Sequence, residues 1–254
     1  MTFNKANAYQ HTLSMELQND KLSYSIINLD TKKSVEEKSF TLLSFNKEEL
    51  AKLLDNEVFT YDFKTISLSI SSNRHTLVPI SIFNASKPVD IFALNHQSPF
   101  DDIDYNRIPE LDIASIYEIP LWIKQLFVVK MPRVKIIHSS TALLKGIFKT
   151  PQFSPRIHIF WQNNAFYLVL TSKNKLDYFN LFQSNHISDL VYHLLFVLEQ
   201  KELNLKDYEV KLYGVNQQWD KLNELTKLLN HKVKVDTQKE KAEYFILSSQ
   251  QLCV

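Results

Sequence analysis

The sequence predicts a mixed α/β protein built from two similar halves. Three strands, a helix, a strand and a helix occur twice along the chain, at an offset of about 143 residues. The segment KTPQFSPR at 149–156, with Pro151 and Pro155, marks a break between the two periodic regions. We therefore expect an N-terminal domain at 1–150 and a C-terminal domain at 151–254, each with a mixed five-stranded sheet flanked by helices.

The first half contains a predicted three-stranded meander, a helix and a fourth strand. Strands are expected where apolar residues alternate with polar ones or form short runs between turn residues. These segments lie at 13–17, 22–27, 34–43 and 63–71. NKEELAKLLDN at 46–56 predicts a short helix, because Asn46 is a good N-cap and acidic residues follow it.

The second half repeats this order. Residues 156–183 predict three strands with turns at QNN and SKNK. The remaining elements are predicted from apolar residues that recur with the period of a helix or of a strand. They are a helix at 186–203, a strand at 208–215, a helix at 216–230, and two strands at KVKVD and YFILSS.

The middle of the chain is less regular. We expect a short helix, loops and one edge strand in 75–107, and a strand at DIASIYEIP. IPLWIKQLFVVKM predicts a helix with Pro120 in its first turn. RVKIIHSSTALLKGIFK predicts a strand, a serine cap and a helix with Gly146 near its end.

Composition argues against several functional classes. Lys and Arg number 29 and Asp and Glu 28, so the chain lacks the basic excess that is typical of nucleic-acid binders. Apolar runs fall short of the ~20 residues that cross a bilayer. With a single cysteine, Cys253, and no secretory signal pattern, we expect a cytoplasmic protein without membrane insertion. The chain has only two glycines and no phosphate-binding glycine motif, which argues against P-loop and dinucleotide-binding enzymes.

The element order, with HTLVP after the fourth strand and RVKIIHSSTALL before the boundary, resembles the actin-like ATPase fold. This fold is built on the ribonuclease H-like unit, and the chain looks like an uncharacterised bacterial family with a degenerate form of it. The resemblance extends roughly from Leu13 to Ser249. It implies a nucleotide cleft in which the first hairpin of each half holds metal and phosphates with an acid and a glycine. It also implies a glycine pair at the adenosine, after the fourth strand of the second half.

The chain departs from that pattern at each of these places. In the first hairpin, ELQND, Glu16 stands where an Asp is expected, and larger residues replace the small ones. The matching turn, FWQNN, has neither an acid nor a glycine. Gly214 lacks a second glycine after it. The candidate vestigial nucleotide cleft comprises Glu16, Gln18, Asn19, Gln162, Asn163, Gly214, Val215 and Asn216.

These departures bear directly on activity. Phosphoryl transfer depends on positioned, metal-bound phosphates, and losing one stabilising donor can cost ~10²–10³ in rate. We therefore expect a non-catalytic protein-binding or scaffold module that has an unknown protein partner and no required cofactor. Weak binding of ATP with Mg²⁺ stays compatible with this hypothesis. The alternatives are an active ATPase or small-molecule kinase that uses Glu16, and a ribonuclease H-type nuclease.

Two acidic groups are candidates for metal binding. Glu16 and Asp20 could form a metal-holding pair, but we interpret them as a strand surface residue and a turn residue. Asp101, Asp102 and Asp104 lie close together in sequence, yet the turn glycine and terminal glutamate of an EF-hand loop are absent. We interpret this segment as a solvated acidic loop.

Two strand-to-loop junctions are candidates for anion binding. Arg74 and His75 follow the fourth strand, and Ser139 and Ser140 precede a helix. A polar loop and ordinary helix capping explain the two junctions equally simply, and we favour these explanations. The aromatic residues of the second meander could stack nucleic-acid bases, but without a basic groove they are better explained by packing. They are Trp161, Phe166, Tyr167, Tyr178, Phe179 and Phe182.

Overall fold

The computed structural model describes residues 3–18, 21–162, 165–184, 186–213, 233–235 and 244–254. The chain divides into two compact units. The first unit contains Met1–Ile147 and Ile246–Val254, and the second contains Phe148–Phe245. The last nine residues thus belong to the first unit. The sequence-based division into domains at 1–150 and 151–254 stays a prediction.

The first unit is organised around a mixed five-stranded sheet, sheet A. Its strands are β1 (His11–Gln18), β2 (Lys21–Asn28), β3 (Ser34–Thr41), β4 (Thr65–Ile70) and β8 (Val134–His138). They lie in the order β3-β2-β1-β4-β8. The meander β1–β3 is antiparallel, whereas β4 pairs in parallel with both β1 and β8. The meander and the fourth strand are confirmed.

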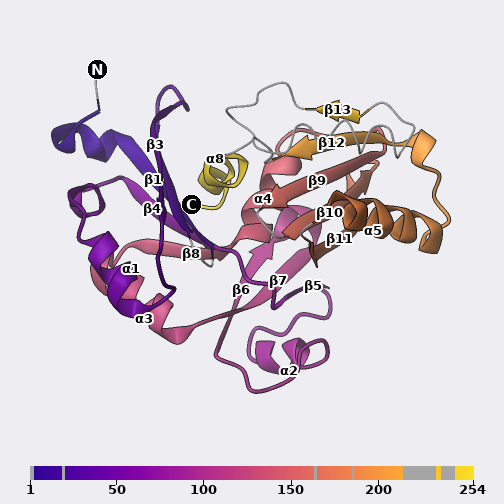
Figure 1. The fold of residues 1–254 in the computed structure, drawn as a ribbon, viewed down its shortest axis with the longest axis horizontal. Coiled ribbons are helices and arrows are strands. Elements are labelled where there is room, and N and C mark those ends of the chain that lie inside the picture. The colour runs from indigo at the N-terminus through magenta and orange to yellow at the C-terminus, as the bar shows by residue number, and fades with distance from the viewer. Residues whose placement is uncertain (1–2, 19–20, 163–164, 185, 214–232, 236–243) are drawn as a thin grey trace. The chain divides into compact units, whose positions relative to one another are not determined.

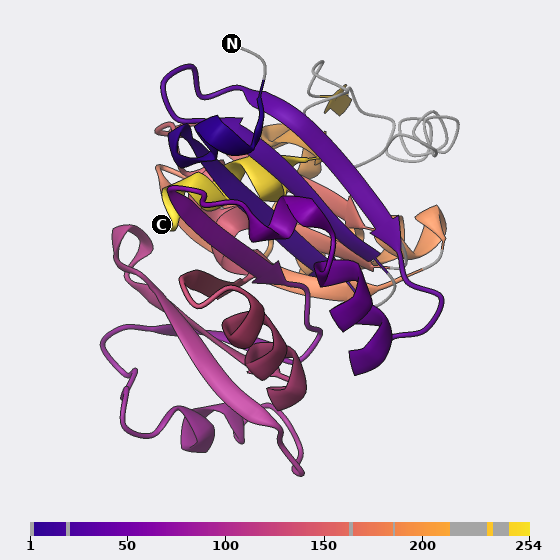
Figure 2. The ribbon, with the colours of Figure 1, turned by 90° about the vertical axis from the view of Figure 1, so that its left-hand side faces the viewer.

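The two faces of sheet A differ in chemistry because alternate residues point to opposite sides of a strand. Leu13, Met15 and Leu17 of β1 belong to the apolar core, which α1 (Lys47–Leu54) and α3 (Leu121–Lys130) complete. Thr12, Ser14 and Glu16 alternate with them, and all three are also buried. Figure 1 shows α1 and α3 on one side of the sheet and α8 (Phe245–Ser249) on the other. Figure 2 views the sheet from the α1 side, with the yellow C-terminal residues behind the strands.

A three-stranded antiparallel sheet, sheet B, completes the first unit. It contains β5 (His75–Pro79), β6 (Asp102–Ile108) and β7 (Ile113–Ile119) in the order β5-β7-β6, next to the short helix α2 (Pro88–Phe92). The prediction of one edge strand in 75–107 was wrong, because both β5 and β6 pair with β7. A small core built around Phe92 and Ile116 stabilises these strands, and Ile103 and Tyr105 of β6 pack against it.

The second unit is organised around a second five-stranded sheet, sheet C. Its strands are β9 (Arg156–Gln162), β10 (Ala165–Ser172), β11 (Lys175–Gln183), β12 (Glu209–Tyr213) and β13 (Val233–Val235), in the order β11-β10-β9-β12-β13. Helix α5 (Ile187–Gln200) packs Leu190 and Leu194 against the apolar face of this sheet. The predicted helix at 216–230 lies outside the described residues.

Strand registers define the internal repeat closely. Thr12 pairs with Thr65 in sheet A, and Arg156 pairs with Glu209 in sheet C, so both parallel pairs join residues 53 positions apart. Arg156 follows Thr12 by 144 positions, one more than the predicted offset of about 143. The hairpins agree with this value, because the pair Glu16–Ser23 in sheet A corresponds to the pair Phe160–Tyr167 in sheet C. Phe160 therefore occupies the position of Glu16 in the second unit.

The strand predicted at YFILSS was wrong. All of these residues except Tyr244 form α8, which is followed by a 3₁₀ turn, Gln250–Leu252. A short apolar run suits a buried helix as well as a strand, and here the burial of Ile246 and Leu247 decides between them. The short helix predicted at 46–56 is confirmed as α1, with Asn46 Oδ1 accepting a hydrogen bond from Glu49 N at 2.8 Å. In the described part of the chain, no helix has both the length and the apolar character to cross a membrane.

Candidate functional site

Glu16, the acid of the candidate cleft, was wrongly interpreted as a strand surface residue, because its side chain is buried in the first unit. Its side chain is on the polar face of β1, between Ser23 of β2 and Ser69 of β4. The residue is only 5% exposed, and its Oε1 accepts a hydrogen bond from the Ser139 hydroxyl at 3.4 Å. Ser139 is the first residue of α4 (Ser139–Ile147). The carboxylate therefore lies near a helix N-terminus, where free amides and the helix dipole favour negative charge.

Other candidate cleft residues are only partly described. Gln18 ends β1, is half-buried and pairs with Lys21 across the hairpin. Asn19, Asn163, Gly214, Val215 and Asn216 lie outside the described residues, as do Asp20 and the side chain of Gln162. The structure thus brings Glu16 and Gln18 together on one strand. The grouping of all eight residues in a cleft stays a prediction.

Gln250 inserts its amide next to Glu16, on the polar face of sheet A. Its Nε2 donates to the Met15 carbonyl at 2.7 Å and contacts the Ser69 hydroxyl at 2.8 Å. Its Oε1 accepts from the Ser67 hydroxyl at 2.6 Å. Gln250 is fully buried, so these bonds replace water and fix the C-terminal segment on β1 and β4. The sequence carries no signal for this contact, which joins residues more than 180 positions apart.

His138 joins the two junctions that were candidates for anion binding. Its Nε2 donates to the Ser72 carbonyl at 2.9 Å, its Nδ1 accepts from the Ser140 hydroxyl at 2.7 Å, and the His75 ring stacks on it at 4.4 Å. Burial lowers the pKa of His138 to about 4 and also lowers the pKa of His75. Both imidazoles are therefore neutral at pH 7, and the cluster is a buried packing network.

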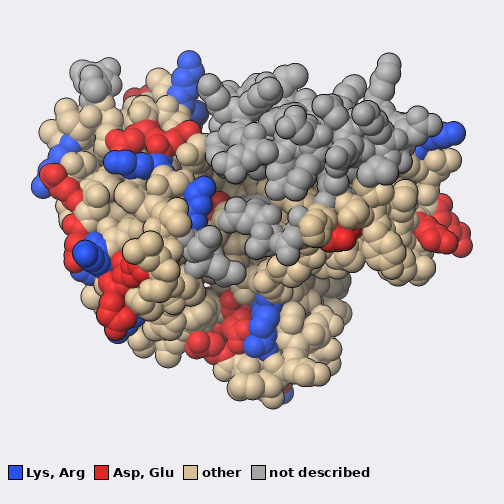
Figure 3. All heavy atoms as spheres, in the orientation of Figure 1, with Lys and Arg blue, Asp and Glu red and all other residues tan. Residues whose placement is uncertain are grey.

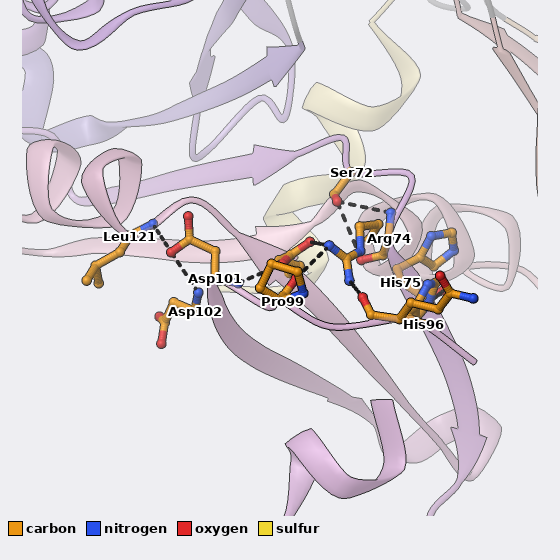
Figure 4. Close-up of polar contacts among 10 residues, drawn as sticks. Ser72, Arg74, His75, His96, Pro99, Asp101, Asp102 and Leu121 are labelled. Atoms are coloured by element: carbon orange, nitrogen blue, oxygen red, sulfur yellow. Dashed lines mark hydrogen bonds and ion pairs between the residues drawn. The ribbon is translucent and has the colours of Figure 1, made fainter. Parts of the chain in front are cut away.

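Arg74 holds the loop that precedes β6 (Figure 4). Its guanidinium donates to the carbonyls of Gln97 and Pro99 at 2.5 and 3.3 Å and pairs with Glu118 at 3.0 Å. It also lies over the Phe100 ring at 5.3 Å. These contacts satisfy its donors within the first unit, so Arg74 acts as a loop clamp.

The interpretation of the Asp101–Asp104 segment as a solvated acidic loop was wrong, because Asp102 and Asp104 belong to β6 and all three aspartates have structural partners. Asp101 Oδ1 accepts from the backbone N–H of Leu121 at 3.0 Å, which caps the start of α3 (Figure 4). Lys124 binds Asp102 at 2.6 Å and Asp104 at 2.9 Å. Within the described ranges, no three His, Cys, Asp or Glu side chains gather as a possible metal site.

The second unit contains a buried polar cluster that the sequence analysis missed. His158 Nδ1 accepts from the Tyr213 hydroxyl, and its Nε2 donates to Gln152 Oε1, each at 3.0 Å. Burial lowers the pKa of His158 to about 3, so its imidazole is neutral. The aromatic residues of the meander belong mainly to the core. Trp161 and Phe166 are buried and stack on each other, and Tyr178 and Phe182 pack against the same cluster.

The family model described as "Protein of unknown function (DUF3822)" matches residues 1–252. The chain belongs to this family. Its structure is similar to that of a Bacteroides thetaiotaomicron protein with an actin-like ATPase fold and unknown function, with 23% identity, full coverage of both chains and a TM-score of 0.86. The predicted actin-like ATPase fold and the predicted membership of an uncharacterised family are confirmed. The prediction of one five-stranded sheet for each half was incomplete, because the first unit also contains the three-stranded sheet B.

Two more distant structures have the same fold. One is the PilM-PilN type IV pilus biogenesis complex, with 12% identity, coverage of 95% of this chain and 98% of the other, and a TM-score of 0.63. The other is the cytoplasmic domain of EpsL, an inner membrane component of the type II secretion system of Vibrio cholerae. Its identity is 10%, its coverage is 96% and 95%, and its TM-score is 0.51. No curated protein matches the chain.

Proposed function

We propose that this DUF3822 protein is a non-catalytic member of the actin-like ATPase fold that works by binding another protein. The observation that carries the proposal is the placement of Glu16. It stands where the fold's metal-holding acid is expected in the first predicted phosphate turn, and it is buried against Ser139. Phe160, only 2% exposed, takes the corresponding position in sheet C.

The chemistry of phosphoryl transfer explains why this placement matters. A metal–phosphate complex needs carboxylates that are open to the ion and amides that are open to the phosphates. In this chain the Glu16 carboxylate lies near the N-terminus of α4. Without this carboxylate, the same helix terminus would favour a bound anion such as a phosphate. Nucleotide binding at such a site is expected to be weak and independent of Mg²⁺.

Two similar structures support a role in assembly. One belongs to a pilus biogenesis complex, and the other is a component of a secretion system. Both cover more than nine-tenths of this chain, so this whole fold occurs within multiprotein machinery. We propose by analogy that a protein partner binds this chain as well.

Surface charge also favours a protein partner over nucleic acid. Figure 3 shows acidic and basic side chains interspersed over the visible, described part of one face. The whole chain has a net charge of +1, whereas nucleic-acid binding requires a concentrated basic surface. We propose a cytoplasmic protein that does not insert into membranes.

Affinity capture tests this function. The tagged protein and its Glu16→Gln variant are each incubated with native lysate, with Mg²⁺ and either ATP or a non-hydrolysable ATP analogue. We expect the same partner in all captures, because binding does not use Glu16 chemistry or hydrolysis. An active ATPase would instead retain its partner with the analogue and release it with ATP, whereas the Glu16→Gln variant would retain the partner with both nucleotides. Recovery of no specific partner would contradict the scaffold role.

A further inference from the structure

The loop between β3 and α1 displays a leucine to solvent. Leu43 is 98% exposed, although leucine is among the residues most often buried. Its backbone N–H donates to Glu49 Oε1 at 2.5 Å, and the N–H and hydroxyl of Ser44 donate to Glu49 Oε2 at 2.7 and 2.9 Å. These bonds from backbone N–H groups lower the pKa of the Glu49 carboxyl. The loop is therefore fixed in the conformation that presents Leu43.

A hollow lies immediately beside this leucine. It has a volume of about 610 Å³ and is lined by the end of β3, the loop and one side of α1. Its apolar lining residues are Phe40, Leu42, Leu43 and Leu53, and Leu42 is buried in the core of the first unit. Leu43 is thus both almost fully exposed and part of the lining of an apolar hollow.

The charges next to the hollow have opposite signs. Lys52 and Asp55 both line it, three positions apart at the end of α1. Lys52 forms no ion pair within the described part of the chain, and Asp55, which pairs with Lys130 at 2.5 Å, keeps a side chain that is 64% exposed. A two-fold axis between these residues would place the Lys52 ammonium of one copy opposite the Asp55 carboxylate of the other.

We infer that this surface binds a second copy of the chain, with Leu43 of each copy inserted into the hollow of the other. In a two-fold contact, each copy contributes both the knob and the hollow, which this surface provides. Because each copy contributes only one leucine and one open hollow, we expect a weak dimer with a Kd of about 10–500 μM. The inference does not depend on the proposed function.

Sedimentation velocity over about 5–500 μM protein, a range that brackets a weak Kd, tests the dimer. The wild type is expected to shift from monomer to dimer, and Leu43→Glu is expected to raise Kd at least about tenfold by placing a charge in an apolar hollow. The matched control is Leu94→Glu, because Leu94 is 81% exposed in the same unit but does not line the hollow. A monomeric wild type, unchanged dimerisation of Leu43→Glu, or equal loss in the control would overturn the inference.

A charge exchange tests the two-fold geometry. Lys52→Asp and Asp55→Lys each place like charges opposite each other and are expected to weaken dimerisation severalfold. The double variant restores opposite charges and is expected to return Kd to near the wild-type value. Failure of the double variant to recover would refute the two-fold contact. Circular dichroism of each variant checks that the fold is kept.

Discussion

Replacing Gln250 with alanine removes the polar anchor of the C-terminal segment. The side chain is fully buried and bonds to the Met15 carbonyl and to the hydroxyls of Ser67 and Ser69. Each such bond contributes about 0.5–1.5 kcal/mol net, and a partner left unsatisfied costs about 1–3 kcal/mol. Because water that enters the space can satisfy some of these groups, we expect the free energy of unfolding to fall by about 3 kcal/mol.

Urea denaturation, followed by circular dichroism and tryptophan fluorescence, measures this loss. The control is Gln251→Ala, because the Gln251 side chain makes no hydrogen bond within the described residues and is only half-buried. We expect the control to change stability by less than about 0.5 kcal/mol. A Gln250→Ala midpoint within error of the control would refute the assignment of residues 246–254 to the first unit.

Two further predictions concern titratable side chains. The pKa values of His138 and His158 are lowered to about 4 and about 3, so below pH 6.5 the unfolded chain binds protons that the folded chain does not. The free energy of unfolding should therefore be highest above about pH 6.5 and fall by about 1.4 kcal/mol per pH unit for each histidine between pH 6 and 4. Urea midpoints measured across this pH range test the prediction, and His138→Gln should show a shallower slope than the wild type. Lys124→Met leaves Asp102 and Asp104 without their shared cation and should lower the free energy of unfolding by about 1–2 kcal/mol, measured by urea denaturation. Lys87→Met, which removes an exposed ion pair, should cost less than about 0.5 kcal/mol, and equal losses in the two variants would contradict this account.

Local sequence pattern was sufficient to predict the meanders. The alternation of Leu13, Met15 and Leu17 with polar residues follows from a strand whose two faces meet different surroundings. The internal repeat could be predicted to within one residue, because the spacing between the first and fourth strands is the same in both sheets. The meanders depend on residues that are close in sequence, and the internal repeat depends on a spacing that occurs twice.

Contacts between distant segments could not be predicted in this way. The YFILSS segment was predicted as a strand, although a short apolar run is compatible with either a strand or a buried helix. Only its packing in the first unit selects the helix. The proximity of His138 to Ser72 follows from the parallel pairing of β8 with β4, which no local pattern reveals. Burial of Glu16 depends likewise on α4, which begins more than 120 residues later.

Calorimetric titration with ATP and Mg²⁺ tests the central claim, that the actin-like fold is kept here without phosphate chemistry. The buried carboxylate of Glu16 and the apolar Phe160 at the matching position predict no Mg²⁺-dependent binding tighter than about 1 mM. They also predict the same titration for wild type and Glu16→Gln, a variant that keeps the size of the side chain. Micromolar binding that requires Mg²⁺ and disappears in Glu16→Gln would contradict the account.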